Sequence, residues 1–152
     1  MAKILIADPI DTQGIERLSG AGHQVDIKKG LTEDELISIV GDYDAMVVRS
    51  ETKVTAAVIE HATKMLAIGR AGVGVDNIDV DVATQHGIAV VNAPTGNTIA
   101  AAEHAFALMM SLARNIPQAD ASMRRGEWAR SKFMGVELRG KTLGIIGLGR
   151  VG

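Results

Sequence analysis

The sequence predicts a doubly wound α/β fold, in which a parallel β-sheet is covered by helices on both faces. Short runs rich in Ile and Val alternate with helix-like stretches over roughly the first hundred residues. The runs are apolar throughout rather than alternating between apolar and polar residues, which is typical of strands buried on both faces. A strand–helix alternation also favours right-handed crossovers between parallel strands.

Five strands and four helices are expected in this region. Thr32 and Glu35 have the spacing of a capping box, which marks the start of the second helix. Aromatic residues make up only 3% of the chain, so the core must consist mainly of aliphatic side chains. The expected strands are Lys3–Ala7, Gln24–Ile27, Ala45–Val48, Leu66–Gly69 and Ile88–Val91, and the expected helices cover 12–19, 32–40, 55–62 and 79–86.

The pattern changes at Asn97. Residues 97–114, NTIAAAEHAFALMMSLAR, predict one long helix that is apolar around most of its circumference. Glu103 and His104 near its middle argue against a membrane span, so protein surfaces are expected to cover it. Residues 117–139 contain Trp128 and several basic side chains with little apolar periodicity. This stretch is interpreted as a segment that needs a partner surface.

Composition excludes several classes of function. The formal net charge is −2, which favours neither nucleic acid nor an anionic membrane as a partner. The absence of cysteine excludes disulfides, thiolate metal sites and a cysteine nucleophile. No two histidines have the spacing of metal ligands, so no metal is expected. The N-terminal apolar run is too short for a signal peptide, and a cytoplasmic location is expected.

Polar and glycine residues follow the expected strands directly. Arg49 and Ser50 follow the third strand, and Arg70 follows the fourth, just before the Gly72–Gly74 turn. Ligands of open α/β sheets bind outside the carboxyl ends of the strands. Two guanidinium groups suit a phosphate or carboxylate, and the backbone N–H groups of the turn suit a second anionic group. The alternative is that the arginines pair with surface carboxylates and the glycines only turn the chain.

The last ten residues, LGIIGLGRVG, predict the beginning of a dinucleotide-binding unit. A strand-like run leads into a G-x-G-x-x-G pattern formed by Gly147, Gly149 and Gly152. In such a unit these glycines make a tight turn, allow the backbone to approach a pyrophosphate and allow close helix–strand packing. The pattern alone is a weak signal, because many glycine-rich turns bind nothing.

Five segments together resemble the D-isomer-specific 2-hydroxyacid dehydrogenases. They are VVRS (47–50), GRAGVGVDNID (69–79), NAPTGN (92–97), GEWARSKFMG (126–135) and GLGRVG (147–152). The resemblance covers essentially the whole chain. It implies an NAD-dependent oxidoreductase, specifically one that oxidises D-3-phosphoglycerate to 3-phosphohydroxypyruvate in the first step of phosphorylated serine biosynthesis.

The resemblance also implies a domain layout. Residues 1–94 are expected to form a flavodoxin-like substrate-binding domain, and residues 95–152 the start of an NAD-binding domain. Within the latter, 97–114 is expected to be an interdomain helix, 117–139 a dimerisation arm, and 142–152 the first strand and glycine-rich turn of a truncated Rossmann domain. A homodimer through 97–139 is therefore expected.

Site residues are carried over position by position. The family's catalytic arginine, glutamate and general-base histidine lie beyond residue 152, so no catalytic residue is expected here, and the chain is expected to be an inactive N-terminal portion of a longer dehydrogenase. Where the family often has Thr, Val73 offers only its backbone. The implied substrate-binding residues are Arg49, Ser50, Arg70, Val73, Gly74, Asn97 and Arg130, the last reaching the partner's site, and the implied cofactor-binding residues are Val73, Gly147, Gly149, Arg150, Val151 and Gly152.

Two other functions remain open at the level of sequence. One is a non-catalytic module that binds anions or dimerises, because a fold alone does not define a function. The other is a dehydrogenase for a different 2-hydroxy acid. The number of arginines favours a phosphorylated acid over an unphosphorylated one.

Overall fold

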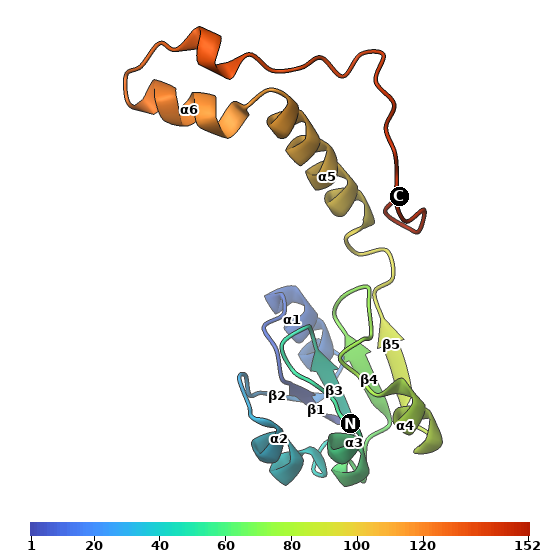
Figure 1. Cartoon of the computed structure of the whole chain (residues 1–152). Coiled ribbons are helices and arrows are strands. Elements are labelled where there is room, and N and C mark those ends of the chain that lie inside the picture. The colour runs from blue at the N-terminus through green and yellow to red at the C-terminus, as the bar shows by residue number, and fades with distance from the viewer. The chain divides into compact units, whose positions relative to one another are not determined.

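Five parallel strands form the central sheet in the first part of the chain (Figure 1). Their spatial order is β2-β1-β3-β4-β5, and every neighbouring pair is parallel. This order is that of flavodoxin-like doubly wound folds, so the expected fold class is confirmed. The strands are β1 (Lys3–Ile6), β2 (Gln24–Ile27), β3 (Ala45–Val48), β4 (Ala67–Arg70) and β5 (Ala89–Asn92).

The computed structural model describes all 152 residues of the chain. They divide into two compact units, Met1–Gly96 and Asn97–Gly152, and each unit is described by itself. The sheet and the first four helices belong to the first unit. Two further α-helices and a 3-10 helix belong to the second.

The helices of the first unit begin at polar caps that the sequence supplies. They are α1 (Thr12–Gly20), α2 (Glu33–Val40), α3 (Ala56–His61) and α4 (Val80–Gln85). The Thr32 hydroxyl accepts from the Glu35 N–H, and the Glu35 carboxylate accepts from the Thr32 N–H at 2.8 Å. The expected capping box is therefore present, and it satisfies backbone donors that the helix leaves unpaired.

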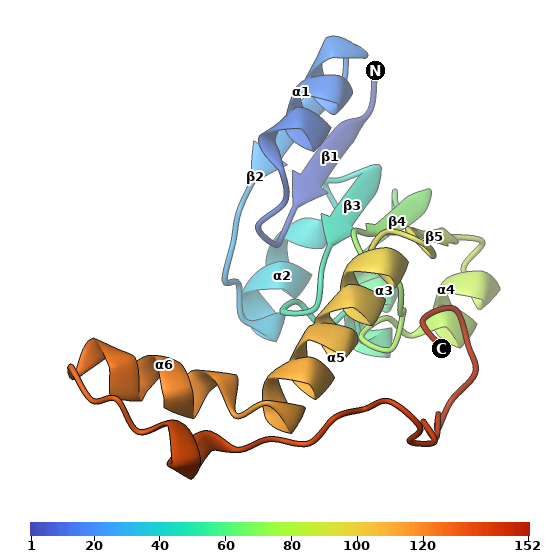
Figure 2. The same ribbon diagram turned by 90° about the horizontal axis from the view of Figure 1, so that it is seen from above.

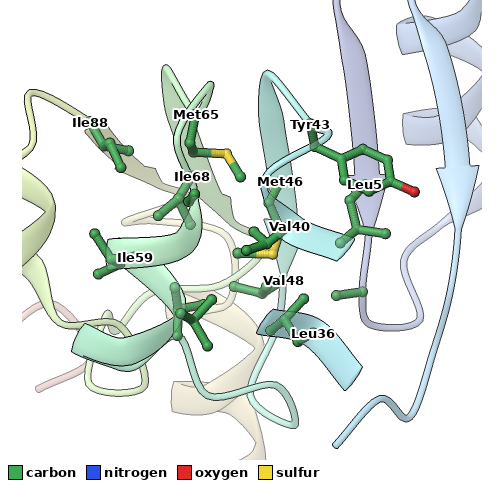
Figure 3. Close-up of a cluster of buried hydrophobic side chains, with 14 of the residues drawn as sticks. Leu5, Leu36, Val40, Tyr43, Met46, Val48, Ile59, Met65, Ile68 and Ile88 are labelled. Carbon is green, nitrogen blue, oxygen red and sulfur yellow. The ribbon is translucent and has the colours of Figure 1, made fainter. Parts of the chain in front are cut away.

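Helices α2, α3 and α4 cover one face of the sheet and enclose the hydrophobic core. Leu36 and Val40 of α2 and Ile59 of α3 pack against the strands (Figure 3). Each fully buried aliphatic side chain contributes roughly 1.5–3 kcal/mol. Helix α1 lies on the opposite face (Figures 1 and 2), where Ile4 and Ile6 of β1 are buried. Burial on both faces is complete only in β1, where Ile4, Leu5 and Ile6 are all buried, whereas β2 and β5 have no buried residue.

The second unit begins with the long helix expected over 97–114, observed as α5 (Thr98–Ala113). Its side chains are exposed to an unusual degree, and none is buried. Large apolar side chains with exposed fractions of 46–80% stand along it, namely Ile99, Phe106, Leu108, Met110 and Leu112. No helix in the structure has both the length and the apolar character needed to cross a membrane.

A second helix, α6 (Ile116–Arg124), and a short 3-10 helix, η1 (Arg130–Phe133), follow α5. Helix α6 is not among the elements expected from the sequence. Asn115 separates α5 from α6 with a φ of 52°, a left-handed conformation that asparagine tolerates better than most residues. Pro117 lies in the first turn of α6, where proline is well accommodated. The Asn–x–Pro sequence could have revealed this boundary.

The strand expected at the start of the glycine-rich segment is not formed, and that prediction is wrong for this structure. Residues 142–146 contain no helix or strand. A strand needs a neighbouring strand to satisfy its backbone N–H and C=O groups. All five strands of the structure belong to the sheet of the first unit, so the second unit provides no ladder partner for this run.

Tyr43 makes polar contacts with Asp26 of β2 and Lys3 of β1. The buried Tyr43 donates its hydroxyl hydrogen to Asp26 Oδ2 at 3.0 Å, and Lys3 Nζ lies 4.6 Å from the centre of the Tyr43 ring. Burial, followed by the hydrogen bond to Asp26, raises the pKa of Tyr43 to about 12. The same hydrogen bond is the main cause that lowers the pKa of Asp26.

Tyr43 is the only tyrosine of the chain, so its ionisation can be followed by tyrosinate absorbance alone. We expect a midpoint of about 12 rather than 10. Because the folded-state pKa is raised, this contact stabilises the fold fully below the unfolded pKa and loses that contribution as the pH rises through about 12. Asp26→Asn should lower the midpoint only part of the way, because burial is the larger cause. A wild-type midpoint near 10 would contradict the contact.

Candidate functional site

The carboxyl ends of β3, β4 and β5 bring the expected substrate-binding residues to one edge of the sheet. The ladder pairs Val48 with Arg70, and Arg70 with Asn92. Arg49 therefore starts the loop after β3 beside the start of the loop after β4. The Ala71 N–H donates to the Val48 carbonyl at 2.8 Å and joins the two loops.

Asp8, directly after β1, holds the loop that carries Arg49 and Ser50. Its side chain is 1% exposed. Oδ2 accepts from the Arg49 N–H at 2.5 Å, and Oδ1 accepts from the Thr52 hydroxyl at 2.5 Å and from the Thr52 N–H at 3.1 Å. These bonds offset the loss of hydration that a buried carboxylate suffers.

Asn77 binds the carbonyl groups of the same loop, whereas Asp8 binds its N–H groups. Its Nδ2 donates to the carbonyls of Arg49 and Thr52, each at 2.7 Å. Neither Asp8 nor Asn77 is among the site residues expected from the sequence. The available signal was positional, because Asp8 directly follows a strand and Asn77 lies in the segment that also contains the Gly72–Gly74 turn.

The side chains of Arg49 and Arg70 differ in their surroundings. Arg49 is exposed, and its Nη1 donates to the Pro9 carbonyl at 3.3 Å. Arg70 lies across Gly72, where a Cβ would stand only 2.0 Å from its Nη1. The Nε of Arg70 is buried and has no hydrogen-bond partner. Neither arginine takes part in an ion pair with a carboxylate of the chain.

In the Gly72–Gly74 turn, the carbonyls of Gly72 and Val73 are hydrogen-bonded, whereas the N–H groups of Val73 and Gly74 are not. The Gly72 carbonyl accepts from the Ala93 N–H at 2.9 Å, and the Val73 carbonyl accepts from Asn92 Nδ2 at 2.5 Å. In a trans peptide the N–H points opposite to the carbonyl. The N–H groups of Val73 and Gly74 thus point away from Asn92 and Ala93, and neither donates to a backbone carbonyl. Paired free amides of this kind can bind an anion.

A hollow of about 470 Å³ lies beside this edge. Ser50 and Asn77 line it, together with Lys53, Asp76 and Asp79, whereas Arg49 and Arg70 do not. Its mixed charge distinguishes it from the arginine side. Asp76 also leaves little room for a side chain at position 74, because its Oδ1 lies 2.6 Å from the position that a Cβ on Gly74 would take.

The remaining expected substrate residues belong to the second unit. Asn97 precedes α5, and its carbonyl accepts from the Ala101 N–H at 2.8 Å while its side chain makes no capping bond. Arg130 opens η1 and lines a hollow of about 210 Å³ with Trp128 and Phe133. Trp128 is 74% exposed.

Five of the six expected cofactor residues lie in a tight turn over residues 147–152 of the same unit, whereas Val73 lies in the first unit. Gly147 has a φ of 95°, which glycine adopts without strain. A Cβ on Gly152 would lie 2.3 Å from the Gly147 carbonyl oxygen, so the two glycines pack closely. A hollow of about 620 Å³ lies between Phe106 and Met109 of α5 and this segment.

Comparison with known proteins identifies the class. The sequence profile of the D-isomer specific 2-hydroxyacid dehydrogenase catalytic domain matches residues 4–140. The chain belongs to this family.

Several curated relatives with high sequence identity are named D-3-phosphoglycerate dehydrogenase. The chain is 59% identical to D-3-phosphoglycerate dehydrogenase of Archaeoglobus fulgidus over 99% of its own length and 28% of that protein. It is 56% identical to the Synechocystis protein of the same name and 52% identical to the human one, with its whole length matched in both cases. The chain thus spans about 28% of these relatives.

Solved structures support the same class. A crystal structure of a Thermus thermophilus protein superposes with a TM-score of 0.89 at 29% identity, over 98% of this chain and 50% of that one. The NAD⁺-bound 3-phosphoglycerate dehydrogenase of Entamoeba histolytica superposes with a TM-score of 0.76 at 30% identity, over 99% of this chain and 47% of that one.

The packing of Arg70 on Gly72 can be tested with Gly72→Ala. The added methyl group must displace the Arg70 guanidinium, while the flexible end of that side chain can move at little expense. We expect the Arg70 Nε–Hε NMR signal to shift, and the free energy of unfolding to change by less than about 1 kcal/mol. Gly20→Ala is a matched control, because a Cβ there meets nothing within 4 Å. An unmoved Arg70 signal in Gly72→Ala would refute this packing.

Proposed function

We propose that this chain is the substrate-binding and dimer-forming part of an NAD-dependent D-3-phosphoglycerate dehydrogenase of the phosphorylated serine pathway. The observation that carries the proposal is the edge formed by Arg49, Arg70 and the free amides of Val73 and Gly74. High identity to relatives of that name supports it.

The substrate carries a phosphate and a carboxylate, and the edge offers one kind of donor for each. Arg49 and Arg70 suit the phosphate, because guanidinium groups bind such oxygens in pairs and neither is neutralised within the chain. The N–H groups of Val73 and Gly74 suit the carboxylate. Ser50 and Asn97 are proposed as further polar contacts, and Arg130 as a contribution to the site of a second subunit.

NAD is the cofactor we propose for the complete enzyme, and when bound it accepts the hydride from the carbon that bears the hydroxyl group. The backbone of Arg150 and Val151 would hold its pyrophosphate, with Gly147, Gly149 and Gly152 allowing the close approach. Val73 would meet its nicotinamide end through the backbone. The tight turn at Gly147 and Gly152 supports this assignment.

Substrate binding is tested by titrating the isotope-labelled chain with 3-phosphoglycerate. Charge-assisted hydrogen bonds contribute roughly 1.5–3 kcal/mol each when well formed, but an open edge should realise only part of this. We expect millimolar affinity, with shifts at the amides of residues 49–50 and 70–74. Arg70→Ala should abolish the response, whereas Arg17→Ala on α1 should keep it. Shifts confined to other residues, or unchanged in Arg70→Ala, would contradict the site.

A homodimer through residues 97–139 is the second part of the proposal. Large apolar side chains are exposed along α5, and Trp128 and Met134 of the arm are 74% and 82% exposed. Contiguous apolar patches beyond a few hundred Å² rarely remain free on monomers. A second copy of the same surface would cover them.

Sedimentation equilibrium over a range of concentrations tests this assembly. We expect the wild type to dimerise, and Trp128→Ala to weaken the dimer by at least about ten-fold, because exposed tryptophans that become buried tend to dominate interfaces. Leu66→Ala is the matched control, since Leu66 is 69% exposed but lies in the first unit. A monomeric wild type, or equal dimerisation of Trp128→Ala, would exclude the arm as the interface.

A further inference from the structure

We propose that Asp8, Thr52 and Asn77 are positioning residues of the anion site and act through Arg49. This inference rests on the proposed function, because it concerns how the edge is prepared for a phosphate-bearing substrate. In the loop over residues 49–52, both the N–H and the carbonyl groups of Arg49 and Thr52 are hydrogen-bonded to side chains. Asp8 accepts hydrogen bonds from the N–H groups of Arg49 and Thr52, and Asn77 donates hydrogen bonds to the carbonyls of the same two residues.

This double attachment defines the direction in which the Arg49 side chain leaves the backbone. Its N–H and carbonyl are both bound, to side chains that come from the loops after two other strands. Thr52 closes the arrangement through its hydroxyl, which donates to Asp8 at 2.5 Å. A loop that is ordered before the ligand arrives loses less conformational freedom on binding.

The use of Asp8 also preserves the charge of Arg49. Although the carboxylate is bonded to the Arg49 backbone, the guanidinium bonds instead to the Pro9 carbonyl. Asp8 thus meets its own hydrogen-bonding needs with N–H and O–H donors and forms no ion pair. The positive charge of Arg49 remains available to an external anion. If the network served only to bind the loops together, Asp8 could equally form an ion pair with the Arg49 guanidinium.

A double-mutant cycle read by the 3-phosphoglycerate titration separates positioning from general stability. Thr52→Val removes the hydroxyl bond to Asp8 with little change in shape, and Thr52→Ser retains it. Asp8→Asn and Asn77→Ala remove the two sides of the attachment. Each variant is measured in the wild-type and Arg49→Ala backgrounds. Tyr43→Phe serves as the control, because it removes one hydrogen bond to Asp26, a carboxylate that does not bond to the loop over residues 49–52.

If these residues act through Arg49, Thr52→Val should weaken binding about ten-fold in the wild type and have no further effect in Arg49→Ala. Thr52→Ser should restore wild-type affinity, and the Arg49 Nε–Hε signal should move in Thr52→Val but not in Tyr43→Phe. Asp8→Asn and Asn77→Ala should follow Thr52→Val where they fold, and Thr52→Val alone decides the question where they do not.

The outcomes that overturn the inference differ from those that overturn the proposed function. Binding by the wild type with an equal loss for Thr52→Val in both backgrounds would show a structural role only and would refute positioning through Arg49. Unchanged affinity in Thr52→Val would refute it as well. If the wild type shows no response to 3-phosphoglycerate at all, the proposed function fails, and this inference fails with it.

Discussion

The common direction of the five strands is the constraint on which the candidate site depends. Since every pair is parallel, each strand ends at the same edge, and the loops after β1, β3, β4 and β5 begin side by side. Residues separated by more than forty positions, such as Asp8 and Thr52, come within hydrogen-bond distance there. An antiparallel arrangement would send alternate loops to opposite edges and would disperse the same side chains.

The polar groups at this edge have two different roles. Short side chains, those of Asp8, Asn77 and Asn92, satisfy the backbone groups that the strand ends leave unpaired. The side chains of Arg49 and Arg70 form no ion pair inside the chain, and the N–H groups of Val73 and Gly74 donate to no backbone carbonyl. Buried backbone groups must be paired somewhere, so this local satisfaction is a condition for leaving other donors free for a ligand.

The two units of the chain differ in how far they bury their own apolar side chains. The first has a core in which side chains from three helices and three strands are buried. In the second, α5 has no buried residue, although its composition is strongly apolar. A helix that is apolar around its circumference gains stability only when several surfaces cover it. In its own unit, α5 therefore lacks the surfaces that would cover its apolar side chains.

Sequence alone determined the features that depend on local chemistry and periodicity. The five strands, the four helices of the first unit, the Thr32 capping box and the long helix at 97–114 all follow from patterns that span only a few residues. The placement of Arg49 and Arg70 at one sheet edge followed as well, because parallel topology follows from strand–helix alternation. Tertiary structure alone decided which partners these residues have. The attachment of Asp8 and Asn77 to one loop joins positions far apart in the chain, and no local pattern encodes such a pairing. The run at 142–146 shows the converse, since a local strand pattern forms no strand where no neighbouring strand can pair with it.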